Sequence, residues 1–200
     1  MAHRIYHISD FIMKITLLNF YWILITVAGI GVFGVFPATV ALFAVVRQWS
    51  KGNDEKFFRQ FVTYVKKDFW QANALGYILA ALGLLLYADV QFILQMDGVI
   101  QEFMKYGFVF LFILYFIIAV YLFPVYVHYD LPLLRNFQYA FIIGFVKPIR
   151  TISIAACIVV IYLVSSYFPG IVILFGVSAP LAYIMWVTYS LLDLEANSIR

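Results

Sequence analysis

The residues that could hold a metal ion in this 200-residue sequence are three histidines and a few acids. His128 and Asp130 are both possible ligands, but residues two apart point to different sides of a helix, and no third ligand is near in sequence. His3 and His7 have the i, i+4 spacing of a metal-binding helix face, which is a weak signal for two histidines near a chain end. We therefore expect no metal site.

Other catalytic chemistry also lacks its usual residues. Cys157 and the serines lie away from the histidines in sequence, so no Cys-His or Ser-His-Asp arrangement can be drawn. The sequence has no Gly-x-x-x-x-Gly-Lys-Ser loop for nucleotide phosphates. We therefore predict no catalytic residue, no cofactor and no enzyme activity.

Composition indicates where such a chain resides. Hydrophobic residues make up 66% and charged residues 12% of the sequence, against about 45–50% and 25% in soluble domains. Backbone groups in hydrocarbon must be paired within their own segment, so long apolar runs predict helices. The net charge of +3 is small and scattered, which argues against a nucleic-acid partner. The fold class is therefore all-α, with the lipid bilayer as surroundings.

The apolar runs predict one transmembrane domain over residues 1–200, a polytopic helical bundle of about six crossings. The long runs are Ile15 to Phe36, Ala72 to Leu94, Gly107 to Val127, and Thr151 to Tyr189 as two passes broken at Phe168-Pro169-Gly170. Pro37 to Trp49 is shorter, and is either a tilted crossing or a re-entrant segment. If it crosses, every Lys and Arg except Lys105 lies on one side. We therefore predict a multi-pass protein of the plasma membrane with both termini in the cytoplasm.

Asp89 is the deepest acid in these runs, a few residues from the end of the third. Ionisable residues inside a bilayer are costly and are therefore functional candidates. Asp89 could accept a hydrogen bond or bind a cation inside the bundle. The alternative, which we favour, is an interfacial acid near the headgroups. Asp193 and Glu195, at the inner end of the last crossing, are interpreted as boundary residues.

Two amphipathic stretches precede crossings on the basic side. The first begins after a helix cap at Asn53 or Asp54 and carries aromatic residues at helical spacing. At an offset of 76, its Arg59-Gln60-Phe61 matches Arg135-Asn136-Phe137 of the second. This pattern indicates a weak internal repeat, with units 37–94 and 107–167, or chance similarity between two interfacial helices.

Several short motifs carry a family resemblance. They are Leu18-Asn19-Phe20-Tyr21-Trp22, Phe36-Pro37-Ala38-Thr39-Val40-Ala41-Leu42, Val46-Arg47-Gln48-Trp49 and Phe57-Phe58-Arg59-Gln60-Phe61. In order and spacing they resemble the YesL-like family of small bacterial membrane proteins, in which many members have Gly-Pro where this chain has Phe36-Pro37. The resemblance implies no defined activity. It does imply an association with carbohydrate uptake, because such proteins tend to be encoded beside carbohydrate ABC importers.

The stretch from Gln138 to Gly144 also resembles the coupling loop of ABC importer permeases, with Gln138 in place of the acid and Tyr139 in place of an alanine. We therefore expect a non-enzymatic accessory protein that contacts importer permease or ATPase subunits. The alternatives are a stand-alone transporter or channel and, with less support, an enzyme acting on lipid-linked substrates. The candidate contact residues are Arg59, Phe61, Arg135, Phe137, Gln138 and Gly144.

Overall fold

The computed structural model describes residues 2–52, 57–129 and 131–198, with the side chains at 2–5, 7–8, 57–58 and 191–198 outside that description. The described residues form helices and connecting turns. Their bounds are α1 Ala2–Ala28, α2 Val35–Ser50, α3 Phe57–Ile93, α4 Val99–His128, α5 Leu133–Val146, α6 Pro148–Tyr167, α7 Gly170–Phe175 and α8 Ser178–Ser198. The all-α prediction is confirmed.

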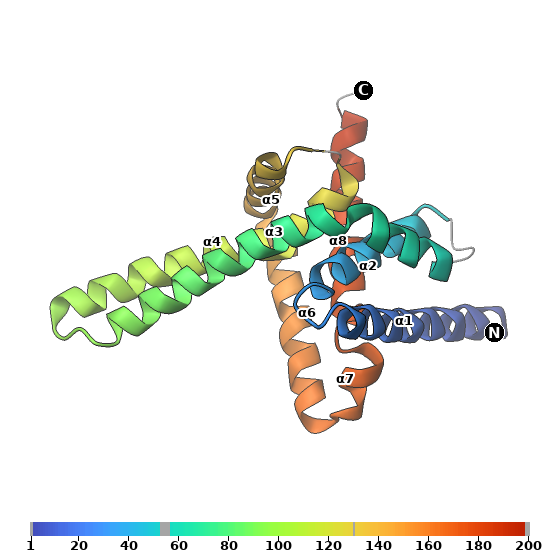
Figure 1. Cartoon of the computed structure of the whole chain (residues 1–200), viewed down its shortest axis with the longest axis horizontal. Coiled ribbons are helices and arrows are strands. Elements are labelled where there is room, and N and C mark those ends of the chain that lie inside the picture. Colours follow the sequence, from blue (N-terminus) through green and yellow to red (C-terminus); the bar gives the residue numbers. More distant parts are fainter. Residues whose placement is uncertain (1, 53–56, 130, 199–200) are drawn as a thin grey trace.

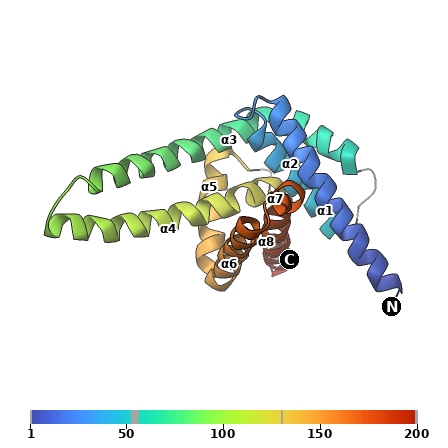
Figure 2. The same ribbon diagram turned by 90° about the horizontal axis from the view of Figure 1, so that it is seen from below.

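Helix α2 lies at the centre of the fold and is packed by α1, α3, α4 and α8 (Figures 1 and 2). Nine of its 16 residues are buried, including every residue from Val40 to Val46. A helix of this length measures about 24 Å, which is less than a hydrocarbon core of about 30 Å. Because protein surrounds it, α2 needs no lipid contact along its length, and this explains how so short a segment belongs to a membrane fold.

The turn between α1 and α2 depends on two glycines. A Cβ on Gly29 would lie 2.4 Å from the Gly34 nitrogen, and a Cβ on Gly34 would lie 2.4 Å from the Ile25 carbonyl oxygen. These close approaches end α1 at Ala28. The first candidate crossing therefore covers Ser9–Ala28 rather than the predicted residues 15–36. The apolar pattern continues through the turn, although the helix ends before it.

Helices α3 and α4 form a long hairpin that extends away from the rest of the molecule (Figures 1 and 2). We call residues 80–115 the arm and the α2-centred remainder the body. Within the arm, all of which the structure describes, Ile93 is the one buried residue. The second amphipathic stretch differs from the first, since α3 is continuous from Phe57 whereas α5 and α6 are separated at Lys147.

The C-terminal part of the chain is broken twice. The break predicted at Phe168-Pro169-Gly170 is confirmed between α6 and α7, and a second one separates α7 from α8. Asn19 of α1, which is fully buried, bridges this second break. Its Nδ2 donates to the Ile173 carbonyl at 2.7 Å, and its Oδ1 accepts from the Ser178 amide at 2.9 Å. One side chain thus satisfies backbone groups that the ends of two helices leave free.

Four helical segments in the described part of the chain are long and apolar enough to cross a membrane. They are Ser9–Ala28, Arg59–Ile93, Val99–His128 and Pro148–Tyr167. Crossings by α2 and α8 stay predictions, as does the internal repeat. Phe36 and Phe123 are each followed by a proline in the sequence, and their rings stack with centroids 6.2 Å apart.

Candidate functional site

The described arginines of the body fall into two groups, and those of the first bond to carbonyl oxygens of other helices. Arg47 of α2 donates from Nη1 to the Val127 carbonyl oxygen at 2.9 Å and from Nη2 to that of His128 at 3.3 Å. Arg150 of α6 donates to the Val187 carbonyl oxygen at 3.1 Å and to the Ser190 hydroxyl. Both guanidinium groups therefore donate to groups on another helix, and Arg47 also complements the negative end of the α4 dipole, because Val127 and His128 are the last residues of α4.

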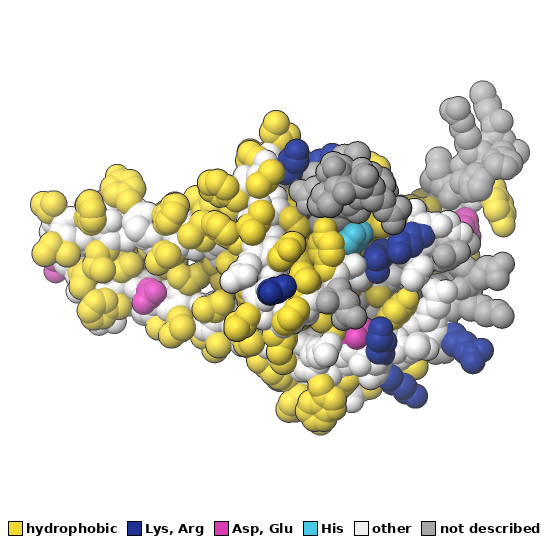
Figure 3. Space-filling view, turned by 90° about the horizontal axis from the view of Figure 1, so that it is seen from above, with side chains coloured by type: hydrophobic (Ala, Val, Ile, Leu, Met, Phe, Trp, Pro, Cys, Tyr) yellow, Lys and Arg dark blue, Asp and Glu magenta, His cyan; other side chains and the backbone are white. Residues whose placement is uncertain are grey.

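The second group is exposed. Arg59 near the start of α3 and Arg135 in the first turn of α5 are exposed, and neither guanidinium bonds to a described residue. Gln138, one turn after Arg135, is exposed as well. Figure 3 shows that Lys and Arg side chains gather over the body, while the arm is mostly hydrophobic. Arg59, Arg135 and Gln138 are thus available for contact with another molecule.

The prediction that Phe61 and Gly144 contact a partner was wrong, because the fold buries both residues. Phe61 is 0% exposed and its ring packs against Tyr21, with centroids 6.0 Å apart. Gly144 is buried where α5 crosses α4, and a Cβ there would lie 2.3 Å from Ile117 Cγ2. Both act in packing within the chain.

Phe137 is partly buried against the hydrophobic core, so only part of its ring could meet a partner. Asp89 lies on α3, in the lining of a groove between α3 and α4. His3, His7, Asp130, Asp193, Glu195 and the predicted cap at Asn53 or Asp54 lie outside the described residues or side chains. Among the described residues, no three His, Cys, Asp or Glu side chains are grouped as metal ligands.

Sequence reasoning missed the buried asparagines. Besides Asn19, Asn73 of α3 donates to the Phe33 carbonyl oxygen at 3.2 Å, holding the α1–α2 turn, and Asn136 of α5 donates to the Leu131 carbonyl oxygen at 3.2 Å. All three are at most 4% exposed. The available signal was an amide side chain within or beside an apolar run, because such a group needs a partner when it is buried.

A groove of about 770 Å³ lies between α1, α2 and α8. Its polar lining includes the ion pair between Lys14 Nζ and Asp10 Oδ2, at 2.6 Å. Most of the other lining side chains are apolar, including Phe11, Trp49 and Trp186. This lining is suited to hydrocarbon rather than to a sugar, which would need several hydrogen-bonding groups.

Comparison with known proteins places these features in a family. Residues 15–90 match the family model described as "Protein of unknown function, DUF624", which covers the second half of α1, all of α2 and most of α3. The chain is 35% identical to "Uncharacterized protein YesL" of Bacillus subtilis (strain 168) over 157 residues, covering 78% of the chain and 74% of that protein.

Two further proteins of Bacillus subtilis (strain 168) are similar over a larger part of the chain. "Uncharacterized protein YteU" is 31% identical over 94% of the chain and 85% of its own length. "Uncharacterized protein YesV" is 33% identical over 88% of the chain and 85% of its own length. No solved structure matches. With its apolar helices and this similarity over most of its length, the chain belongs to the YesL-like DUF624 family.

Proposed function

We propose that the chain is a non-enzymatic accessory protein of the bacterial plasma membrane that binds subunits of a carbohydrate ABC importer. In this proposal both termini lie in the cytoplasm, and Arg59, Arg135 and Gln138 belong to the contact surface. The importer is the partner that the neighbourhood of YesL-like proteins implies. The role itself would be assembly, stabilisation or regulation of the importer.

The observation that carries the proposal is that some described arginines are bonded inside the protein whereas others are exposed. Arg47 and Arg150 bond inside the protein to carbonyl oxygens of α4 and α8. Arg59 and Arg135 are exposed, and their guanidinium groups make no bond with a described residue. An exposed guanidinium offers five N–H donors in a planar fork, which suits carboxylates on a partner protein. The described residues also lack a grouped set of metal ligands for catalysis.

Affinity isolation from cells grown on the relevant sugar tests the proposal. The tagged protein is extracted in mild detergent, and co-isolated proteins are identified by mass spectrometry. We expect permease or ATPase subunits of a carbohydrate importer to be enriched. The double variant Arg59→Ala/Arg135→Ala should lose most of this enrichment.

The matched control is Lys66→Ala/Lys67→Ala, which removes two exposed positive charges from the same helix as Arg59. It should keep the enrichment if the arginines act by directed contact rather than by total charge. If no importer subunit is enriched with the unchanged protein, the proposed function is wrong.

A further inference from the structure

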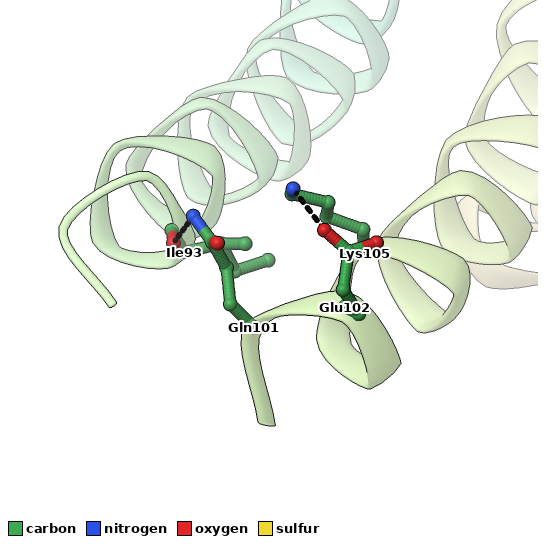
Figure 4. A network of polar contacts seen from close by, with 4 residues as sticks. All are labelled: Ile93, Gln101, Glu102 and Lys105. Atoms are coloured by element: carbon green, nitrogen blue, oxygen red, sulfur yellow. Dashed lines mark hydrogen bonds and ion pairs between the residues drawn. The ribbon is translucent and has the colours of Figure 1, made fainter. Parts of the chain in front are cut away.

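The two helices of the arm touch at two levels. Nearer the body, a Cβ on Gly83 would lie 2.6 Å from Tyr115 Oη, so α3 and α4 approach closely there. At the tip, Gln101 of α4 donates from Nε2 to the Ile93 carbonyl oxygen of α3 at 3.3 Å (Figure 4).

A groove of about 480 Å³ opens between the two levels. Asp89 is the one acid in its lining, and the other lining residues are apolar or glycine, among them Phe92, Met104 and Phe108. Gly107 leaves room beside it, since a Cβ there would meet no atom within 4 Å. The groove is therefore an apolar slot with one carboxylate in it.

The arm contains no positive charge for this carboxylate. Lys105 is the single Lys or Arg between residues 68 and 134. Its Nζ lies 2.7 Å from Glu102 Oε1 on the same helix, as Figure 4 shows. Asp89 makes no hydrogen bond or ion pair with a described residue. Asp89 is exposed and lies four residues before the end of its candidate crossing at Ile93, so its carboxylate is open to a partner. A lone Lys or Arg in another protein's crossing is costly and needs such an acid.

We propose that this groove binds a transmembrane helix of a partner protein that carries a Lys or Arg side chain, which pairs with Asp89. The inference rests on the proposed function, because it assigns the accessory protein a second contact surface inside the bilayer. Pairing with Asp89 offsets the cost of the partner's Lys or Arg within its crossing. The apolar walls accept the rest of the partner helix, and Gly107 allows close approach.

The test uses the full-length protein in lipid nanodiscs and a synthetic transmembrane peptide. The peptide is a 21-residue Leu/Ala helix with one Lys near its end, labelled for energy transfer, and a second peptide has Gln at the same position. We expect the Lys peptide to bind about 3- to 15-fold more tightly than the Gln peptide, the range of polar contacts between helices in membranes. Asp89→Asn should abolish this difference.

Asp97→Asn removes one charge from the turn at the tip and should leave the difference intact. Gly107→Leu fills the groove and should weaken binding of both peptides, which tests the site even if Asp89→Asn folds poorly. Equal binding of the Lys and Gln peptides to the unchanged protein would overturn the proposal. The peptide assay contains no importer subunit, so its failure would not contradict the proposed function. Conversely, failure to isolate importer subunits would not contradict binding of a Lys or Arg helix in the groove.

Discussion

The body and the arm are both rich in apolar residues, yet they place those residues differently. In α2, at the centre of the body, nine of 16 residues are buried by other helices. In the arm, Ile93 is the one buried residue between positions 80 and 115. Large side chains such as Leu84 and Phe110 are 69% and 61% exposed. The arm therefore gives its apolar surface to lipid or to a partner, whereas α2 uses its apolar surface for the fold. Helix α6 of the body resembles the arm in this respect, since Ile154 is its one buried residue.

This difference shows that hydropathy indicates which helices enter a bilayer, but not whether lipid or protein contacts each helix there. Packing between helices in lipid depends on close approach and polar contacts rather than on hydrophobicity. The body supplies both, with Gly76 beneath Phe36 and Asn19 across the α7–α8 break. Substitutions in the body should therefore change stability, and equivalent substitutions in the arm should not.

The largest effect is expected for Asn19→Ala. This change removes the Asn19 partner of the Ile173 carbonyl, whose bond is partly buried, and of the Ser178 amide, whose bond is buried. Each buried unsatisfied group costs about 1–3 kcal/mol, so we expect a loss of about 3 kcal/mol. Reversible unfolding in mixed detergent micelles measures it. Thr16→Ala removes an exposed bond within α1 and is the control; equal losses for both variants would contradict the role of Asn19.

A pair of glycines compares the two regions directly. A Cβ at Gly76 would lie 2.1 Å from Phe36 Cγ, so Gly76→Ala should force α2 away from α3 and destabilise the protein by about 1–3 kcal/mol. A Cβ at Gly107 would meet nothing within 4 Å, so Gly107→Ala should be neutral or slightly stabilising. The same unfolding assay applies. Similar losses at both positions would show that the arm packs as tightly as the body.

Within the body, the bonded Arg47 and the exposed Arg59 should differ in their contribution to stability. Arg47→Ala removes two charge-assisted bonds to the last carbonyls of α4. Hydrogen bonds to charged groups contribute about 1.5–3 kcal/mol, so we expect a loss of about 2 kcal/mol. Arg59→Ala should change the thermal midpoint little, because Arg59 is exposed. If Arg59→Ala were equally destabilising, Arg59 would be structural and the proposed contact surface would lose a member.

Much of the fold followed from the sequence, because apolar runs, glycines and prolines are local signals. The break at Pro169 and the helix leading from Arg59 into the third crossing were predicted in this way. The burial of Phe61 and Gly144 could not be, since it depends on Tyr21 and Ile117 from other helices. An amphipathic pattern says which side of a helix is apolar, but it does not distinguish lipid from protein on that side.

The smallest effect is expected at the tip of the arm. Glu102 and Lys105 form an exposed i, i+3 pair, with side chains 61% and 44% exposed. Such pairs contribute about 0.3–0.5 kcal/mol at most, because solvent screens them. Glu102→Gln should therefore leave unfolding unchanged within error. It would, however, release Lys105, which becomes free to pair with Asp89 on the other helix of the groove. In the peptide assay this variant should reduce the preference for the Lys peptide, and an unchanged preference would show that Lys105 does not reach Asp89.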